Sequence, residues 1–252
     1  MSNFAPAAEA AVQILTFLAC SERELGLSEI SRGTGINKNM VFRILGSLEK
    51  EGWVYGNEQK YALTLLPFCL SAKAVARTTL NSVSLPLLYQ LREETGESTY
   101  LGILKDDTVL YLQHLDGAGN VRVAGSVGGR YELYCSAPGK VLLAFAEEDF
   151  REEYLSREHE RKTVNTIVEK EALSEELCRI REAGFATDRE EFGNGISCVA
   201  SPIFDYSGKV IAAVGCSAFT PHGQSAAVID KLLPAVCRTA KEISTRLGSL
   251  NR

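Results

Sequence analysis

A tight break at Gly33-Thr34-Gly35 separates two segments of helical periodicity near the start of the chain. Before the break, Leu27–Ser31 predicts a short helix, with Ser28 placed to cap its first turn. After it, Asn37 is a good cap for a helix over Lys38–Glu51, in which apolar residues recur every three or four positions. Two helices joined by so short a turn are typical of a helix-turn-helix unit.

The segments on either side of this pair complete a small domain. Glu9–Cys20 predicts a first helix with a wide apolar face. Trp53–Tyr55 and Tyr61–Leu63 flank the polar stretch Gly56–Lys60, which predicts a β-hairpin with a polar tip. Helix, helix, turn, helix and hairpin follow one another in the order of a winged helix-turn-helix, which we expect over residues 1–66.

One side of the predicted third helix is apolar and packs into this domain, which leaves its polar side free to enter a major groove of DNA. Amides pair bidentately with adenine, and guanidinium or ammonium groups reach guanine or phosphate. Two more basic residues, before the turn and on the hairpin, are expected to meet the DNA backbone. The predicted DNA-contacting residues are Lys38, Asn39, Met40 and Arg43 on the helix, with Arg32 and Lys60 at the backbone.

The formal net charge of −5 excludes a protein that coats nucleic acid through a generally basic surface. Residues 1–83 carry eight Lys or Arg and seven Asp or Glu, whereas the rest of the chain carries nineteen and twenty-five. A nearly neutral first part and an acidic second part indicate two domains with different roles. Sequence-specific DNA binding needs only a local basic patch, which a dimer doubles. The alternative is a three-helix protein-interaction domain whose charges serve only solvation.

The second part of the chain mixes short apolar strands with separate helices. We predict an α+β domain with an antiparallel sheet over residues 84–252, joined to the first domain by a linker helix at 67–83. Helices are expected near Leu85–Leu91, from Pro138 to Ala146, and over Glu171–Ala183 and Ala226–Leu247. Strands are expected at Ser98–Leu104, Thr108–Leu115, Val121–Ala124, Tyr131–Cys135, Phe185–Asp188, Ser197–Phe204 and Lys209–Phe219.

Few residues are spaced as catalytic groups or metal ligands. Cys198 and His222 form a conceivable nucleophile pair, but strand cysteines are most often inert core thiols. The three histidines, at 114, 159 and 222, lack the spacing of metal ligands, so we expect neither a metal site nor a cofactor. The carboxylates of Glu190-Glu191 are expected on the solvated surface.

Seven cysteines without CxxC or CxxH spacing indicate reduced thiols in a cytoplasm and no structural zinc. Apolar stretches such as Val210–Phe219 are about half the length of a membrane span, which needs about twenty residues. The first basic residue, Arg23, follows the apolar stretch Ala10–Cys20, so no secretory signal is expected. We therefore expect a cytoplasmic protein with no membrane partner.

Four separated segments of the second part follow the order of a known family. They are Thr95–Ser98, Ser136–Ala144, Gly184–Glu191 and Gly195–Ile203. Together with Ile30–Leu45 in the first domain, they resemble the IclR family of bacterial transcriptional regulators over most of the chain. The resemblance implies a winged helix-turn-helix, a linker helix and a GAF-like effector-binding domain. It also implies a homodimer or homotetramer that binds double-stranded operator DNA and responds to a small-molecule effector.

Carried onto this chain, the resemblance locates the effector pocket at the start of a helix and across the sheet. Free N–H groups and the positive dipole end of such a helix attract anions. For each residue the alternative is structural: a hydroxyl satisfied by the backbone, a turn or cap carboxylate, or a core thiol. The implied pocket residues are Ala137, Pro138 and Gly139 at the helix start, Asp188, Cys198 and Ser217 on the sheet, and Val123 and Tyr131 as an apolar wall.

The chain also departs from the family pattern. Asn39-Met40 stands where the family often has Ser-Thr, so the operator sequence does not transfer. Pro138 removes one N–H donor from the implied anion site, and Gly215 stands where some pocket serines occur. With bulky Tyr131 near the mouth, these changes favour a less polar, aromatic effector.

The sequence thus predicts a transcriptional regulator, not an enzyme, controlled by a carboxylate or aromatic metabolite. The competing hypothesis is a metabolite-binding protein or thiol enzyme whose first domain serves only assembly and does not bind DNA.

Overall fold

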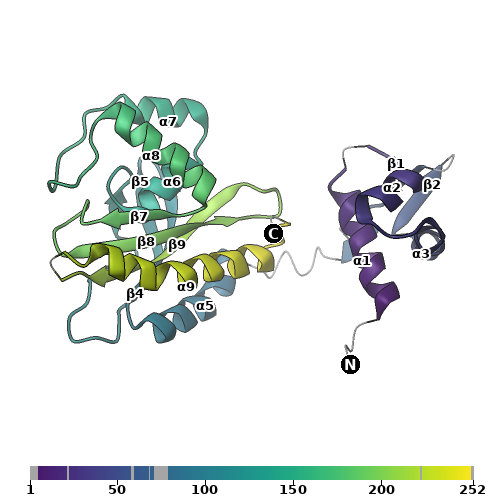
Figure 1. Ribbon diagram of the computed structural model, residues 1–252, viewed down its shortest axis with the longest axis horizontal. Coiled ribbons are helices and arrows are strands. Elements are labelled where there is room, and N and C mark those ends of the chain that lie inside the picture. Colours follow the sequence, from purple (N-terminus) through teal and green to yellow (C-terminus); the bar gives the residue numbers. More distant parts are fainter. Residues whose placement is uncertain are drawn as a thin grey trace. The chain divides into compact units, whose positions relative to one another are not determined.

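The computed structural model of the chain describes residues 5–21, 23–57, 60–67, 69–70, 79–221 and 223–250. The chain divides into two compact units, residues 1–77 and residues 78–252, each with its own core (Figure 1). Among the described helices, none combines the length and the apolar character that crossing a membrane requires.

The amino-terminal unit packs three helices around one apolar core, and the predicted winged helix-turn-helix is confirmed. The helices are α1 (Pro6–Ala19), α2 (Leu27–Thr34) and α3 (Lys38–Lys50). Gly35 ends α2 with a φ of 73°, a left-handed conformation that suits glycine. Asn37 caps α3 as predicted, since its side chain accepts a hydrogen bond from the Met40 N–H at 2.9 Å.

A small antiparallel sheet forms the wing. The predicted hairpin consists of β2 (Val54–Asn57) and β3 (Lys60–Leu63), and its tip residues 58 and 59 lie outside the described ranges. A further strand, β1 (Leu25–Gly26), pairs with the other edge of β3. Two residues are too few to leave a periodic signal, so this strand was not predicted.

The first turn of α2 corrects the prediction that Ser28 caps this helix. The cap is Gly26, whose N–H donates to the Glu29 carboxylate at 2.9 Å, and Ser28 lies within the helix. The pairing of Gly26 with Lys60 in the sheet determines where the strand ends and the helix begins. That contact joins residues far apart in the chain, so the local pattern around Ser28 did not contain it.

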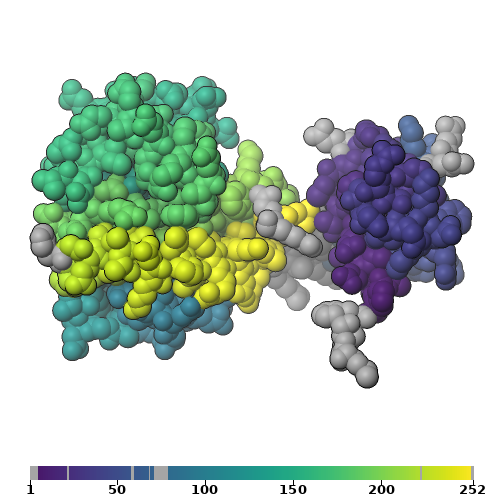
Figure 2. All heavy atoms as spheres, in the orientation of Figure 1, coloured from purple at the N-terminus to yellow at the C-terminus, as the bar shows by residue number. Residues whose placement is uncertain are grey.

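The carboxy-terminal unit is a six-stranded antiparallel sheet between two layers of helices, which confirms the predicted α+β class. Helices α5 (Leu80–Thr95) and α9 (Ser225–Arg246) cover one face; α6 (Ala137–Ala144), α7 (Glu148–Leu155) and α8 (Lys170–Ala183) lie over the other (Figures 1 and 2). In order across the sheet, the strands are β6 (Arg130–Glu132), β5 (Thr108–Leu115), β4 (Ser98–Lys105), β9 (Val210–Phe219), β8 (Ile196–Phe204) and β7 (Ala186–Arg189).

Two strand predictions in this unit need correction. Residues 121–124 form no strand; the Val123 carbonyl accepts a hydrogen bond from the Ser98 hydroxyl at 2.8 Å instead of pairing with a neighbouring strand. The predicted strand Tyr131–Cys135 ends at Glu132, because the chain turns there to enter α6. Alternation of apolar residues alone did not distinguish these segments from strands.

Within the predicted linker helix at 67–83, residues 67, 69 and 70 are helical, and residues 68 and 71–78 lie outside the described ranges. Helix α5 begins at Leu80, and Thr79 caps it by accepting from the Ser82 N–H at 3.1 Å. Residues 80–83 therefore lie in α5. The boundaries of the two predicted domains remain predictions.

Candidate functional site

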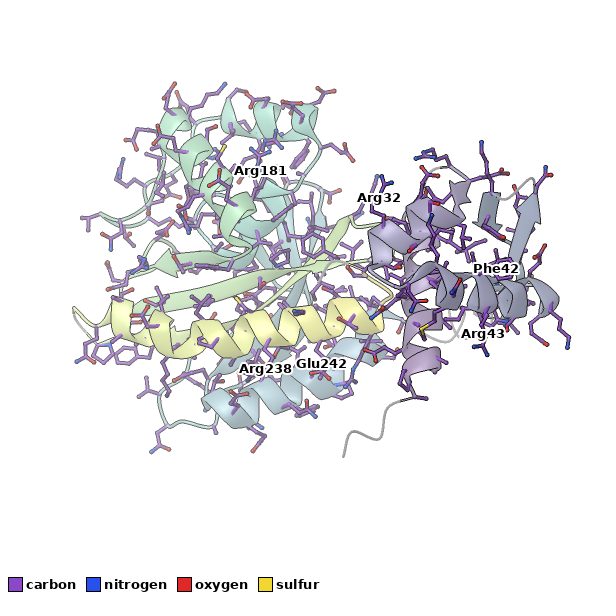
Figure 3. All side chains as sticks on the ribbon, turned by 45° about the vertical axis from the view of Figure 1, so that its right-hand side comes forward. Arg32, Phe42, Arg43, Arg181, Arg238 and Glu242 are labelled. Carbon is purple, nitrogen blue, oxygen red and sulfur yellow. The ribbon has the colours of Figure 1, made fainter. Side chains whose placement is uncertain are left out.

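One face of α3 carries exposed side chains while the opposite face lies in the amino-terminal core. Val41, Ile44 and Leu45 are buried. Figure 3 shows Phe42 and Arg43 on α3 and Arg32 on α2. The reading face is defined here as the exposed residues of the first three turns of α3, namely Lys38, Asn39, Phe42, Arg43, Gly46 and Ser47; Glu49 and Lys50 are exposed in the last turn.

Five of the six residues predicted to contact DNA are exposed. Arg32 lies in the last turn of α2, and Lys60 begins β3. The exception is Met40, which is half-buried and packs against the core, because it lies one turn before the buried Ile44 at the edge of the apolar stripe. Phe42, with 61% of its surface exposed, was not predicted on this face. Its position one turn after Asn39 was the available signal.

In the carboxy-terminal unit, strand register aligns a row of polar residues across four neighbouring strands. Asp188 on β7 pairs with Cys198 on β8, Cys198 pairs with Ser217 on β9, and Ser217 pairs with Ser98 on β4. Directly paired residues share a face of the sheet, so these four side chains lie side by side. The Cys198 sulfur and the Ser217 hydroxyl are 3.1 Å apart.

A cavity of about 80 Å³ lies over three residues of this row, Asp188, Cys198 and Ser217. Six of the eight predicted pocket residues line it, namely Val123, Tyr131, Pro138, Asp188, Cys198 and Ser217. The other lining residues are Tyr111, His114, Ala124, Gly125, Ser136, Phe192 and Ile196.

Ala137 and Gly139 do not line this cavity, although both are predicted pocket residues. Gly139 faces the preceding turn, where an added Cβ would lie 2.5 Å from the Glu132 carbonyl oxygen. Its N–H donates to the Ser136 hydroxyl at 3.2 Å, and Pro138 has no N–H. The start of α6 therefore has fewer free donors than a typical anion-binding helix.

Asp188 is the most unusual polar group of the cavity. One carboxylate oxygen accepts the N–H groups of Glu191 and Phe192, at 2.7 and 3.3 Å. The other, Oδ2, is buried and has no hydrogen-bond partner among the described residues. Burial, reinforced by the nearby Glu191 charge, raises the pKa of Asp188 to about 7. Near neutral pH this carboxyl therefore carries a proton part of the time and can donate.

Next to Asp188 lies a buried ion pair that corrects the expectation of a solvated Glu190-Glu191. The Lys140 ammonium is fully buried and lies 2.6 Å from the Glu191 carboxylate and 3.4 Å from that of Glu176 on α8. Glu190 is half-buried and accepts from the Gly195 N–H at 2.8 Å. The signal available in the sequence was Lys140 itself, a lone cation within an apolar helix.

Cys198 does not have the environment of an activated nucleophile. Burial raises the pKa of its thiol well above the ordinary value, which keeps the sulfur protonated. The predicted partner, His222, lies outside the described residues. The thiol is thus suited to a hydrogen bond or an apolar contact, not to attack on a substrate.

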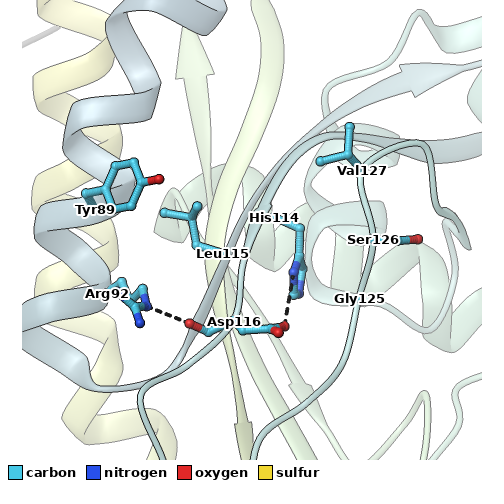
Figure 4. Close-up of a pocket in the computed structure, with 8 residues that line it drawn as sticks. All are labelled: Tyr89, Arg92, His114, Leu115, Asp116, Gly125, Ser126 and Val127. Carbon is cyan, nitrogen blue, oxygen red and sulfur yellow. Dashed lines mark hydrogen bonds and ion pairs between the residues drawn. The ribbon is translucent and has the colours of Figure 1, made fainter.

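A more open pocket of about 450 Å³ adjoins the cavity, and His114 and Gly125 line both (Figure 4). An added Cβ at Gly125 would lie 2.5 Å from the His114 ring, so the two residues are packed closely together. The Arg92 guanidinium donates to the Asp116 backbone carbonyl at 2.6 Å and fixes the other side of this pocket. His114 is therefore the wall between the inner cavity and the surface pocket.

Comparison with known proteins matches both units to one family. Residues 7–58 match the IclR helix-turn-helix domain, and residues 72–245 match the bacterial transcriptional regulator IclR C-terminal domain. The chain is 34% identical to the HTH-type transcriptional regulator KdgR of Escherichia coli, over 90% of this chain and 87% of the relative. It is 35% identical to the DNA-binding transcriptional repressor YiaJ of the same organism, over 88% of this chain and 80% of the relative.

A crystal structure of an IclR-type regulator from Silicibacter sp. TM1040 superimposes with a TM-score of 0.84, at 26% identity and over 97% of both chains. The matched relatives are named as transcriptional regulators and not as enzymes.

Proposed function

Because the chain belongs to the IclR family of bacterial transcriptional regulators, we propose that it binds operator DNA through the reading face of α3 and releases or engages it according to an effector bound at Asp188. The observation that carries the proposal for DNA is the exposed group Lys38, Asn39 and Arg43 on the second helix of a helix-turn-helix. Arg32 and the wing residue Lys60 are proposed to contact the DNA backbone. The protein acts in the cytoplasm as a homodimer or homotetramer.

The effector proposed here is a small carboxylate, aromatic in its apolar part. Tyr111, Tyr131 and Phe192 supply aromatic surface, with ring centroids 4.3 Å apart for the first two and 5.9 Å apart for the last two. The unpartnered Oδ2 of Asp188, in its protonated form, donates to a carboxylate oxygen, and the Ser217 hydroxyl provides a second donor. The effector enters from the surface pocket past His114.

Effector and operator affect each other only if the effector binds two conformations of the protein unequally. A typical coupling of about 1–3 kcal/mol changes operator affinity between about fivefold and 150-fold. The segment between the two units, predicted as a linker helix, is proposed to transmit this change. Whether the effector favours release or engagement of DNA follows from the sign of the measured coupling.

The DNA part of the proposal is tested by Arg43→Ala. Loss of a guanidinium that contacts a base or a phosphate is expected to weaken operator binding about 10- to 100-fold and to reduce its salt dependence. Affinity is measured by fluorescence anisotropy, on a duplex footprinted in the gene's own promoter region, at several salt concentrations. The matched control is Arg181→Ala, an exposed arginine on α8 in the other unit. Equal affinity of Arg43→Ala and wild type would remove α3 from the interface.

The effector part is tested by pH. The protonated fraction of a carboxyl with a pKa near 7 falls about tenfold from pH 6 to pH 8, so a carboxylate effector is expected to bind about tenfold more weakly at pH 8. Asp188→Asn keeps a donor and is expected to flatten this dependence, and Asp188→Ala is expected to weaken binding at both pH values. The measurement is calorimetry with the carboxylates that raise the unfolding temperature in a screen. Asp149→Asn, on the exposed side of α7, is the control. Tighter binding at pH 8 contradicts the proposal.

A further inference from the structure

The reading face of α3 contains one large apolar side chain among polar neighbours. Phe42 has 61% of its surface exposed, whereas the apolar residues Val41, Ile44 and Leu45 of the same helix are buried. The remaining residues of the face are polar or glycine, namely Lys38, Asn39, Arg43, Gly46 and Ser47. A surface that binds another protein usually has a wider apolar patch at its centre. Here a single ring is surrounded by an amide and two cations, so a protein partner is not expected.

The chemistry of the DNA major groove fits this arrangement. Its rim carries phosphates that attract Lys38 and Arg43, and its floor exposes one apolar group, the 5-methyl of thymine. Phe42 lies one helical turn after Asn39 and beside Arg43, so a helix that brings these two to base edges brings the ring to the groove floor as well.

Gly46 supplies a second, independent observation. It lies one turn after Phe42 on the same face, and an added Cβ there would meet no atom of the described residues within 4 Å. Its φ is not in the left-handed region, so neither packing nor backbone conformation requires glycine. Glycine weakens the interior of a helix relative to alanine, and its presence here is explained if another molecule comes close to the helix backbone.

We propose that Phe42 reads thymine through the 5-methyl group in the major groove, and that Gly46 allows α3 to approach the bases closely enough for that contact. The inference rests on the proposed function, since it requires α3 to lie in the groove. The proposal adds a preference for thymine to the contacts that the polar residues of the face would make.

The test uses full-length protein and the footprinted operator duplex, with each thymine replaced in turn by deoxyuridine, which lacks only the methyl group. Wild-type affinity is expected to fall about two- to tenfold at one or more thymines, and Phe42→Ala is expected to bind the two duplexes equally there. The inference is overturned if no replacement changes wild-type affinity. It is also overturned if Phe42→Ala loses as much affinity as wild type at the same replacements. Because Phe42 is exposed, the Phe42→Ala variant should have the same unfolding temperature as wild type.

Gly46→Ala is expected to change stability and operator affinity in opposite directions. The variant is expected to unfold at a slightly higher temperature, because the helix is strengthened, and to bind the operator at least about tenfold more weakly, because the methyl occupies the approach. Unchanged operator affinity overturns the close approach. Failure of the proposed function is seen separately: in that case Arg43→Ala also binds like wild type, whereas a Phe42 failure leaves the Arg43→Ala loss intact.

Discussion

Replacing Lys140 with methionine is expected to lower the free energy of unfolding of the carboxy-terminal unit by about 3–5 kcal/mol at pH 8. The Lys140 ammonium is buried 2.6 Å from the Glu191 carboxylate, and Glu191 has 5% of its surface exposed. Without the ammonium, the buried Glu191 carboxylate lies near Asp188 and Glu176 and has no ion-pair partner among the described residues. Burial already raises the pKa of Glu191, and losing Lys140 raises it further.

The sign of the pH dependence follows from this raised pKa. A carboxyl whose folded-state pKa exceeds its unfolded value stabilises the protein at low pH and loses that contribution as pH rises through the folded pKa. The difference between Lys140→Met and wild type should therefore grow from pH 5 to pH 8.

Urea unfolding followed by far-UV circular dichroism measures this effect. Trp53, the single tryptophan of the chain, lies in the amino-terminal unit, so its fluorescence reports the unfolding of that unit. The urea midpoint measured by this fluorescence should be the same for Lys140→Met and wild type. Lys140→Met/Glu191→Leu is expected to recover most of the loss, because an apolar pair of similar volume replaces a buried ion pair at little cost. Lys170→Met, whose partner Glu152 is half exposed, is the control, with an expected loss of at most about 1 kcal/mol. A loss of the same small size for Lys140→Met would contradict the prediction.

Gly215→Ala is expected to destabilise the same unit by about 3 kcal/mol or more, close to the upper end of what overpacking costs. The added Cβ would lie 2.1 Å from the Val199 carbonyl oxygen and 2.5 Å from the Tyr100 hydroxyl oxygen. These two oxygens are joined by a hydrogen bond of 3.1 Å, and Val199 is held in the sheet. Relief therefore requires the β8–β9 pairing to shift.

Thermal unfolding checks this prediction. A loss of about 3 kcal/mol lowers the unfolding temperature by about 6–12 °C in a unit of this size. Gly193→Ala is the matched control, because its nearest neighbour would be the Ile196 side chain at 3.6 Å, an ordinary contact. A Gly215→Ala variant that melts within about 2 °C of wild type contradicts the argument. The same geometry explains why this chain has glycine at position 215, where some family members have a pocket serine: the Tyr100 ring occupies the space that a serine side chain would need.

Much of the fold was predictable because its signals are local. Asn37 caps α3 through a bond to Met40 three residues away, and apolar periodicity located α8 and α9 to within a residue or two. Six residues of the cavity were also identified, but through resemblance to a family and not through spacing. Asp188, Cys198 and Ser217 are brought together only by strand register.

Three of the errors share a physical cause: the residue's structural partner is distant in sequence. Glu191 was expected in solvent, yet it lies buried against Lys140, fifty-one residues earlier in the chain. Helix α2 is capped at Gly26 and not at the predicted Ser28, because Gly26 pairs with Lys60 in the sheet. Residues 121–124 satisfy a backbone carbonyl through the Ser98 hydroxyl and not through a strand. Phe42 is a different case: no role was predicted for it from the sequence, although it lies three residues after Asn39 and so on the same side of the helix.

The polar row across the sheet, where we propose that the effector binds, bears on how such a protein changes its effector. Cys198 and Ser217 project from strands whose backbone ladder is made by N–H and C=O groups alone, and that ladder is indifferent to which small side chain each position carries. If the effector binds at this row as proposed, exchanges at these two positions change which groups it meets, while the sheet itself is kept. Under that proposal, regulators that share this sheet can differ in the effector they recognise without losing the fold.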